Sequence, residues 1–116
     1  MHAFEAAATA RFKDGLVEEI REHMPDHYHA LGEQGVREAV ELGIRNASAH
    51  LIASEAGVTL FVRFMMLFGL TFDTDPNLPW AQSTLQDSQE LPESARVAAL
   101  QQAAIEFLEE MQAGAG

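Results

Sequence analysis

The sequence predicts an all-α protein, and three observations support this fold class. Helix-favouring residues such as Ala, Leu, Glu and Gln are plentiful, whereas β-branched residues are scattered singly instead of alternating. Apolar residues return at intervals of three and four along several segments. Residues 58–72 are apolar with no repeating polar face, so other helices should surround them. We therefore expect one compact domain over residues 1–116, a bundle of four to five helices around a central apolar helix at about residues 55–71.

The first helix is predicted from residue 3 to about residue 24. Its apolar side chains recur at every fourth position: Phe4, Ala8, Phe12, Leu16, Ile20 and Met24. Gly15 lowers helix stability by about 1 kcal/mol relative to alanine, so we expect a kink or a close helix contact there. Pro25 ends this helix because the residue before a proline is driven out of helical geometry.

The second long helix is predicted from about Gly32 or Glu33 to about Ala53, after a connector at residues 24–35 in which Pro25 can begin a short turn of helix. Its inward face is expected to contain Val36, Val40, Gly43, Ile44, Ala47 and Leu51. Gly43 and Ala47 are small, which would allow the central helix to approach closely. Leu42 lies off this face, where an exposed apolar strip would suit a dimer or partner contact.

The central helix is predicted from Glu55 to about Thr71, with Ser54 as its N-cap. Arg63 lies in the middle of this apolar helix, so its charge must reach solvent or pair with a carboxylate. Asp73 and Asp75 are the nearby candidates, and we expect a structural ion pair.

A stiff turn follows, for which the sequence proposes Asp73, Asp75, Pro76, Pro79 and Trp80 as the structural residues. Asp75-Pro76-Asn77 suits a type I turn, and Pro79 suits the first position of a short helix through about Leu85. Trp80, the only tryptophan, is expected to fold back on the core.

The same turn resembles the start of a calcium loop but departs from that motif at its specific positions. Leu78 replaces the turn glycine, and Thr84 replaces the bidentate glutamate. We therefore expect the aspartates to cap backbone amides.

The last helix is predicted to begin at Leu91-Pro92-Glu93. Its apolar stripe is expected to contain Val97, Leu100, Ala104, Phe107, Leu108 and Met111. Residues 113–116 are predicted as a frayed tail.

The charge balance restricts the class of partner. Eighteen acidic residues against seven basic ones give a formal charge of -11, spread as -5 over residues 1–55 and -6 over residues 56–116. Such a surface repels phosphate backbones and anionic lipids, which disfavours nucleic-acid and membrane binding and favours a basic protein partner. The absence of cysteine excludes disulfides and thiolate metal sites, and no signal peptide is visible, so we expect a cytoplasmic protein.

Four potential metal ligands lie within a short segment: His23, Asp26, His27 and His29. A Zn²⁺ or Ni²⁺ site is one interpretation. However, Pro25 prevents His23 and His27 from sharing one helix face, and the spacing matches no structural zinc pattern. We therefore interpret the segment as a polar connector, with His23, His27 and His29 as the candidates if a metal is bound.

His50 and Ser54 are a candidate base and nucleophile four residues apart. No third catalytic group, nucleophile elbow or glycine-rich anion loop accompanies them, so we expect a histidine at the edge of the core. We expect no catalytic or cofactor-binding residues, and a small His-based metal-dependent enzyme stays as the alternative from another class.

Residues 31–50 and 61–81 carry a pattern of their own, LGEQGVREAVELGIRNASAH followed by FVRFMMLFGLTFDTDPNLPWA. The matching positions are Leu31, Gly32, Glu33, Gly35, Gly43, Ile44, Phe68, Gly69, Phe72, Asp73, Asp75, Pro76, Leu78, Pro79 and Trp80. This pattern resembles a group of small bacterial proteins encoded beside type VI secretion spike, adaptor and toxin genes. That family has an aromatic-glycine pair where this chain has His50-Leu51.

The resemblance implies a secretion-associated accessory role and supplies no catalytic residues. Our leading hypothesis is a non-enzymatic accessory or chaperone-like protein that binds a secretion effector, toxin or spike protein with a basic surface. The alternative is an immunity protein that neutralises a cognate toxin, and a homodimer is compatible with either.

Overall fold

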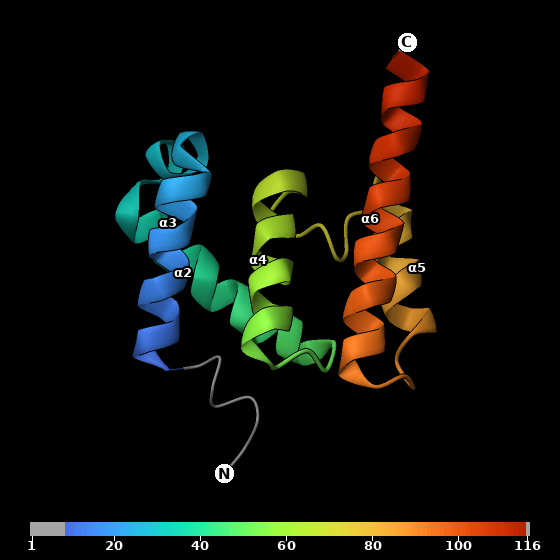
Figure 1. Ribbon diagram of the computed structural model, residues 1–116, viewed down its shortest axis with the longest axis horizontal. Helices are drawn as coiled ribbons and strands as arrows, with labels where there is room; N and C mark the ends of the chain where they lie inside the picture. The colour runs from blue at the N-terminus through green and yellow to red at the C-terminus, as the bar shows by residue number, and fades with distance from the viewer. Residues whose placement is uncertain (1–8, 116) are drawn as a thin grey trace. The chain divides into compact units, whose positions relative to one another are not determined.

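The structure, a computed structural model, describes residues 9–115 and contains five α-helices and no strand within that range. In chain order these are α2 (Ala10–His23), α3 (Pro25–Ala49), α4 (Glu55–Phe68), α5 (Pro79–Asp87) and α6 (Glu93–Ala115) (Figure 1). The all-α fold class is therefore confirmed. None of the described helices combines the length and apolar character needed to cross a membrane.

The chain divides into two compact units. The first, Met1–Leu70, contains α2, α3 and α4, and the second, Thr71–Gly116, contains α5 and α6. The single domain expected from the sequence stays a prediction.

Helix α2 begins at Ala10, where the Thr9 hydroxyl oxygen accepts a hydrogen bond from the Phe12 amide at 3.2 Å. The predicted helical residues 3–8 lie outside the described part of the chain. The helix ends at His23, as the proline predicted. The expected kink or close contact at Gly15 is wrong, because α2 runs through it and a Cβ added there would meet no atom within 4 Å.

Helix α3 consists of two helical segments joined at Gly32, whose φ of 75° and ψ of 167° are not helical. The connector predicted at residues 24–35 is therefore mostly helical, because Pro25 occupies the first turn of the new helix, where its missing N–H costs nothing. The second segment starts after Gly32, as the sequence predicted, but it ends at Ala49 and not at Ala53.

The early end of α3 is a Schellman turn. The Ile52 amide donates to the Ala47 carbonyl and the Leu51 amide donates to the Ser48 carbonyl, both at 2.9 Å. Leu51 has a φ of 62°, the left-handed conformation that such a turn requires. Its predicted inward position is wrong, since the reversal leaves Leu51 61% exposed and Ile52 1% exposed.

The contact of α3 with α4 confirms the close approach expected at Gly43. A Cβ on Gly43 would lie 2.5 Å from Val62 Cγ2 and 3.0 Å from Met65 Sδ, so only glycine fits without movement. Ala47 is fully buried on the same face. Leu42 is half-buried, so the exposed apolar strip expected there is absent.

Helix α4 is the apolar helix of the prediction, and half of its 14 residues are buried: Gly57, Val58, Phe61, Val62, Phe64, Met65 and Met66. The predicted N-cap is confirmed, because the Ser54 hydroxyl oxygen accepts from the Gly57 amide at 3.0 Å. The helix ends at Phe68 and not at Thr71, since Gly69 leaves helical geometry with a φ of 119°.

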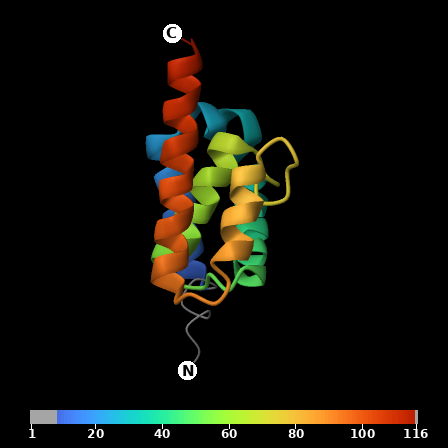
Figure 2. The ribbon, with the colours of Figure 1, turned by 90° about the vertical axis from the view of Figure 1, so that its right-hand side faces the viewer.

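In the second unit, α5 starts at Pro79 as predicted and ends two residues later than expected, at Asp87. Helix α6 starts at Glu93 and continues to Ala115, through most of the segment predicted as a frayed tail. Figure 2 shows α5 beside the first half of α6, while the second half extends past it. Leu108 and Met111 of the predicted inward stripe are accordingly 43% and 57% exposed, which corrects that part of the prediction.

Candidate functional site

The predicted turn before α5 is closed by its own polar groups. The Leu78 amide donates to the Asp75 carbonyl at 2.9 Å, with Pro76 at the second position of the turn. The Asp75 carboxylate accepts from the Asn77 amide at 2.8 Å, as an Asx turn does. Asp73 is only 5% exposed. The Asp75 carboxylate therefore stabilises the turn that leads into Pro79 at the start of α5.

Arg96 is a structural residue that the sequence reasoning missed. It is 4% exposed, and its Nη2 donates to the Leu91 carbonyl at 2.6 Å and to the Gln89 carbonyl at 3.4 Å. A buried guanidinium with carbonyl partners holds the turn between α5 and α6. A single arginine in an amphipathic pattern carries no signal of this role, because the pattern does not show where the preceding turn folds.

The histidine segment does not assemble a metal site. His23 is exposed at the end of α2, while His27 and His29 lie on the first turns of α3. The rings of Tyr28 and His29 are nearly perpendicular, with centroids 6.0 Å apart. Among residues 9–115, no three His, Cys, Asp or Glu side chains lie close enough together to hold a metal ion.

His50 and Ser54 have separate structural places. His50 is the C-cap of α3, and its ring centroid lies 6.0 Å from that of Phe61. Ser54 uses its hydroxyl oxygen to accept the hydrogen bond that caps α4.

Arg63 does form the expected ion pair, but with a different carboxylate. Its Nε and Nη2 lie 2.7 Å and 2.5 Å from Glu19 Oε2. Glu19 is on α2, 44 residues earlier in the chain, so the prediction of Asp73 or Asp75 as partner is wrong. Proximity in sequence was a poor guide because α2 and α4 face each other within the first unit.

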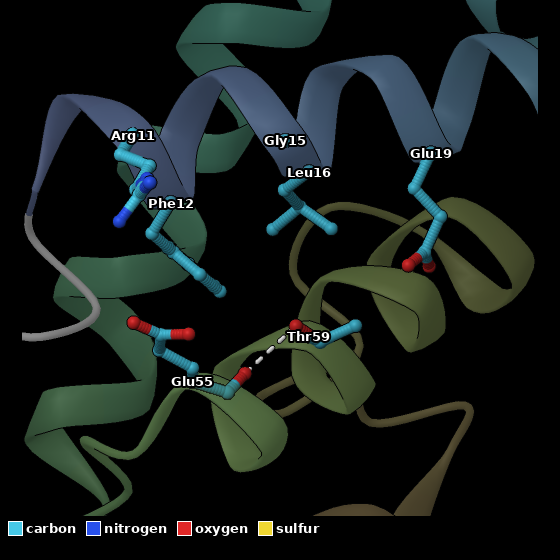
Figure 3. Close-up of a pocket in the computed structure, with 7 residues that line it drawn as sticks. All are labelled: Arg11, Phe12, Gly15, Leu16, Glu19, Glu55 and Thr59. Atoms are coloured by element: carbon cyan, nitrogen blue, oxygen red, sulfur yellow. Dashed lines mark hydrogen bonds between the residues drawn. The ribbon is translucent and has the colours of Figure 1, made fainter.

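One groove of about 270 Å³ lies between α2 and α4. Figure 3 shows Phe12 and Leu16 pointing from α2 toward α4, with Arg11 and Glu55 near the same end of the groove. Thr59 donates its hydroxyl to the Glu55 carbonyl at 2.7 Å, within its own helix. The rim therefore carries charges of both signs, which gives no strong preference for a charged ligand.

A second groove of about 400 Å³ lies between α5 and α6. Its apolar walls contain Pro79, Trp80, Ala103 and Phe107. The Trp80 ring lies 5.4 Å from the Phe107 ring and 6.5 Å from the Phe72 ring, with interplanar angles of 32° and 31°. Two of the predicted turn residues, Pro79 and Trp80, thus line a hollow on the surface.

The rim of this second groove is acidic. Glu106 and Glu110 lie on successive turns of α6, and both line the groove. Glu106 Oε2 accepts a hydrogen bond from Gln102 Nε2 at 3.1 Å. Because an aromatic wall and carboxylates meet here, the groove is suited to a cationic group with an apolar neighbour. The sequence does not predict this groove, because the apolar stripe of α6 does not show which helix packs against it.

Comparisons of this chain with protein-family models, with curated proteins and with solved structures found no match.

Proposed function

We propose that this is a non-enzymatic binding protein, an accessory or chaperone-like factor whose partner is a protein with a basic surface. The observation that carries the proposal is the charge of residues 71–116, which contain eight acidic residues and a single basic one, Arg96. Arg96 is buried at 4% exposure, so the charge that this segment offers to solvent is negative. A surface of one sign attracts and orients a partner of the other sign.

The resemblance to proteins encoded beside type VI secretion genes makes a secretion effector, toxin or spike protein our candidate partner. Leu51 is a departure of this chain from the resembled family. Its φ of 62° is one that glycine adopts without strain, and glycine is the residue that the resembled family has there.

Affinity capture from the source cells at low and moderate salt, followed by mass spectrometry, tests the proposal. We expect a basic effector, toxin or spike protein to be retained at low salt and released as screening increases. Recovery of nothing beyond the protein itself would contradict the proposal.

An immunity protein is the second candidate, because the same acidic surface could cover a basic toxin active site. Co-expression of the captured toxin with this protein separates the two roles. Loss of toxicity would indicate immunity, whereas co-purification with toxicity retained would indicate a loading or chaperone role.

A further inference from the structure

We propose that the groove between α5 and α6 binds a basic amphipathic helix of the partner, with an arginine or lysine side chain over Trp80 and between Glu106 and Glu110. This inference rests on the proposed function and names the surface and the class of segment that it binds.

The wall of the groove suits a cation that carries an apolar stem. Trp80 is half-buried, and its ring lies beside the rings of Phe72 and Phe107. The face of an indole ring attracts a guanidinium or ammonium group, and the stem of such a side chain packs on apolar surface. Ala103 adds little bulk to the opposite wall, which leaves the groove open at this level.

The rim sets the spacing of the basic residues. Glu106 and Glu110 are four residues apart on α6, which is about 6 Å along a helix axis. A partner helix that lies along α6 presents its own residues four apart with the same rise, so two basic side chains can meet both carboxylates. The hydrogen bond from Gln102 uses one oxygen of Glu106 and leaves the carboxylate with further acceptor capacity.

The lining of the groove accounts for the apolar face of the proposed partner helix. Pro79, Trp80, Ala103 and Phe107 form its walls, and Glu106 and Glu110 lie at its rim. The apolar face of an amphipathic helix would pack on these walls while its basic side chains reach the glutamates.

The charge of the surroundings selects a basic occupant over a neutral or acidic one. No lysine, arginine or histidine follows Arg96 in the sequence, while Glu106, Glu109 and Glu110 do. The groove in the first unit lacks this selectivity because Arg11 shares its lining with Glu19 and Glu55.

Titration of the full-length protein with a synthetic amphipathic peptide tests the inference. The peptide has leucines on one face and arginines four residues apart on the other, and its scrambled version has the same composition without the apolar face. Trp80, the only tryptophan, reports occupancy of the groove by fluorescence, and calorimetry gives the affinity. We expect the scrambled peptide to bind about tenfold more weakly.

Paired charge variants locate the binding surface. Glu106→Gln with Glu110→Gln is expected to weaken binding by about tenfold or more. The matched control, Glu90→Gln with Glu109→Gln, removes the same charge from exposed positions that do not line the groove, and we expect a change of less than about twofold. Melting curves of both double variants check that any loss is not a loss of folding, since Glu110 lies near the first turn of α5, where a helix dipole favours a carboxylate.

Each failure has a distinct meaning. Equal weakening by both double variants would overturn the groove and leave the proposed function, because acidity alone would then explain the binding. Absence of peptide binding while a basic partner is still captured from cells would do the same. A dimer of the free protein that Glu106→Gln and Glu110→Gln dissociate would make a second copy the occupant and overturn the inference. Failure of capture as well would remove the proposed function itself.

Discussion

The two units of the chain manage charge in opposite ways. In the first unit, basic side chains lie beside carboxylates: Arg37 with Asp14 and Glu33, Arg63 with Glu19, Arg21 with Glu18, and Lys13 with Glu41. The hydrogen bond to Asp14, followed by that to Glu33, raises the pKa of Arg37 above its ordinary value. In the second unit, the one arginine is buried against backbone carbonyls. The first unit, with a formal charge of -4, therefore pairs much of its charge at the surface, whereas the second unit, with a formal charge of -7, presents a negative surface.

The largest effect that we predict is for Trp80→Ala. The ring lies beside the rings of Phe72 and Phe107 but is only half-buried, so we expect a loss of about 3 kcal/mol of stability, at the lower end for a buried aromatic. Chemical denaturation followed by circular dichroism measures it. Thr84→Ala, on the same groove, is the control and should change stability by less than about 1 kcal/mol. An unchanged midpoint for Trp80→Ala would show that the ring serves only as a contact surface.

Substitutions at two glycines compare a close helix contact, at Gly43, with an open helix surface, at Gly15. Gly43→Ala places a methyl group 2.5 Å from Val62 Cγ2, and we expect a loss of about 2 kcal/mol. Gly15→Ala meets open space in the middle of a helix and should gain about 0.5 to 1 kcal/mol. Melting temperatures that move in the same direction for both variants would contradict the close contact between Gly43 on α3 and Val62 on α4.

Arg96→Met tests whether the only basic residue of the second unit is structural. Methionine keeps the apolar stem but leaves the Leu91 and Gln89 carbonyls without this donor, so we expect a loss of about 1 to 2 kcal/mol. Arg45→Met removes an exposed charge and should change stability by less than about 0.5 kcal/mol. Equal midpoints in urea for the two variants would show that Arg96 is instead a surface cation.

The smallest effects compare single carboxylates of the two units. Glu19→Gln breaks a partly exposed ion pair with Arg63, and we expect a loss of about 0.5 kcal/mol that shrinks in high salt. Glu109→Gln relieves repulsion among the glutamates at the end of α6, so stability should hold or rise by up to about 0.5 kcal/mol. A loss of stability in Glu109→Gln would indicate that the Glu109 carboxylate makes a favourable contact, against the repulsion expected at the end of α6.

Local sequence signals predicted the fold well wherever they act through backbone geometry. Ser54, Pro25 and Pro79 each mark a helix boundary in the structure, because caps and prolines act within one turn. The helix ends at Ala49 and Phe68 were placed too late, since Leu51 carries no sign that it adopts a left-handed conformation and Gly69 fits an apolar run.

The candidate site was only partly predictable, because it depends on which helices face each other. The sequence identifies Pro79 and Trp80 as part of a turn, but their groove is completed by Glu106 and Glu110, which are 26 and 30 residues after Trp80 in the sequence. The partner of Arg63 was missed for the same reason. The formal charge is divided almost evenly between the halves of the sequence, and a charge count does not show that Arg96 is buried.

The most direct test of the account is nuclear magnetic resonance mapping of the labelled protein during titration with the basic amphipathic peptide. We predict chemical-shift changes along α5 and the second half of α6, including the Trp80 indole and the amides around Glu106 and Glu110. Changes confined to α2 and α4, where each basic side chain already lies beside a carboxylate or shares a mixed rim, would contradict the central claim that the acidic second unit binds the partner.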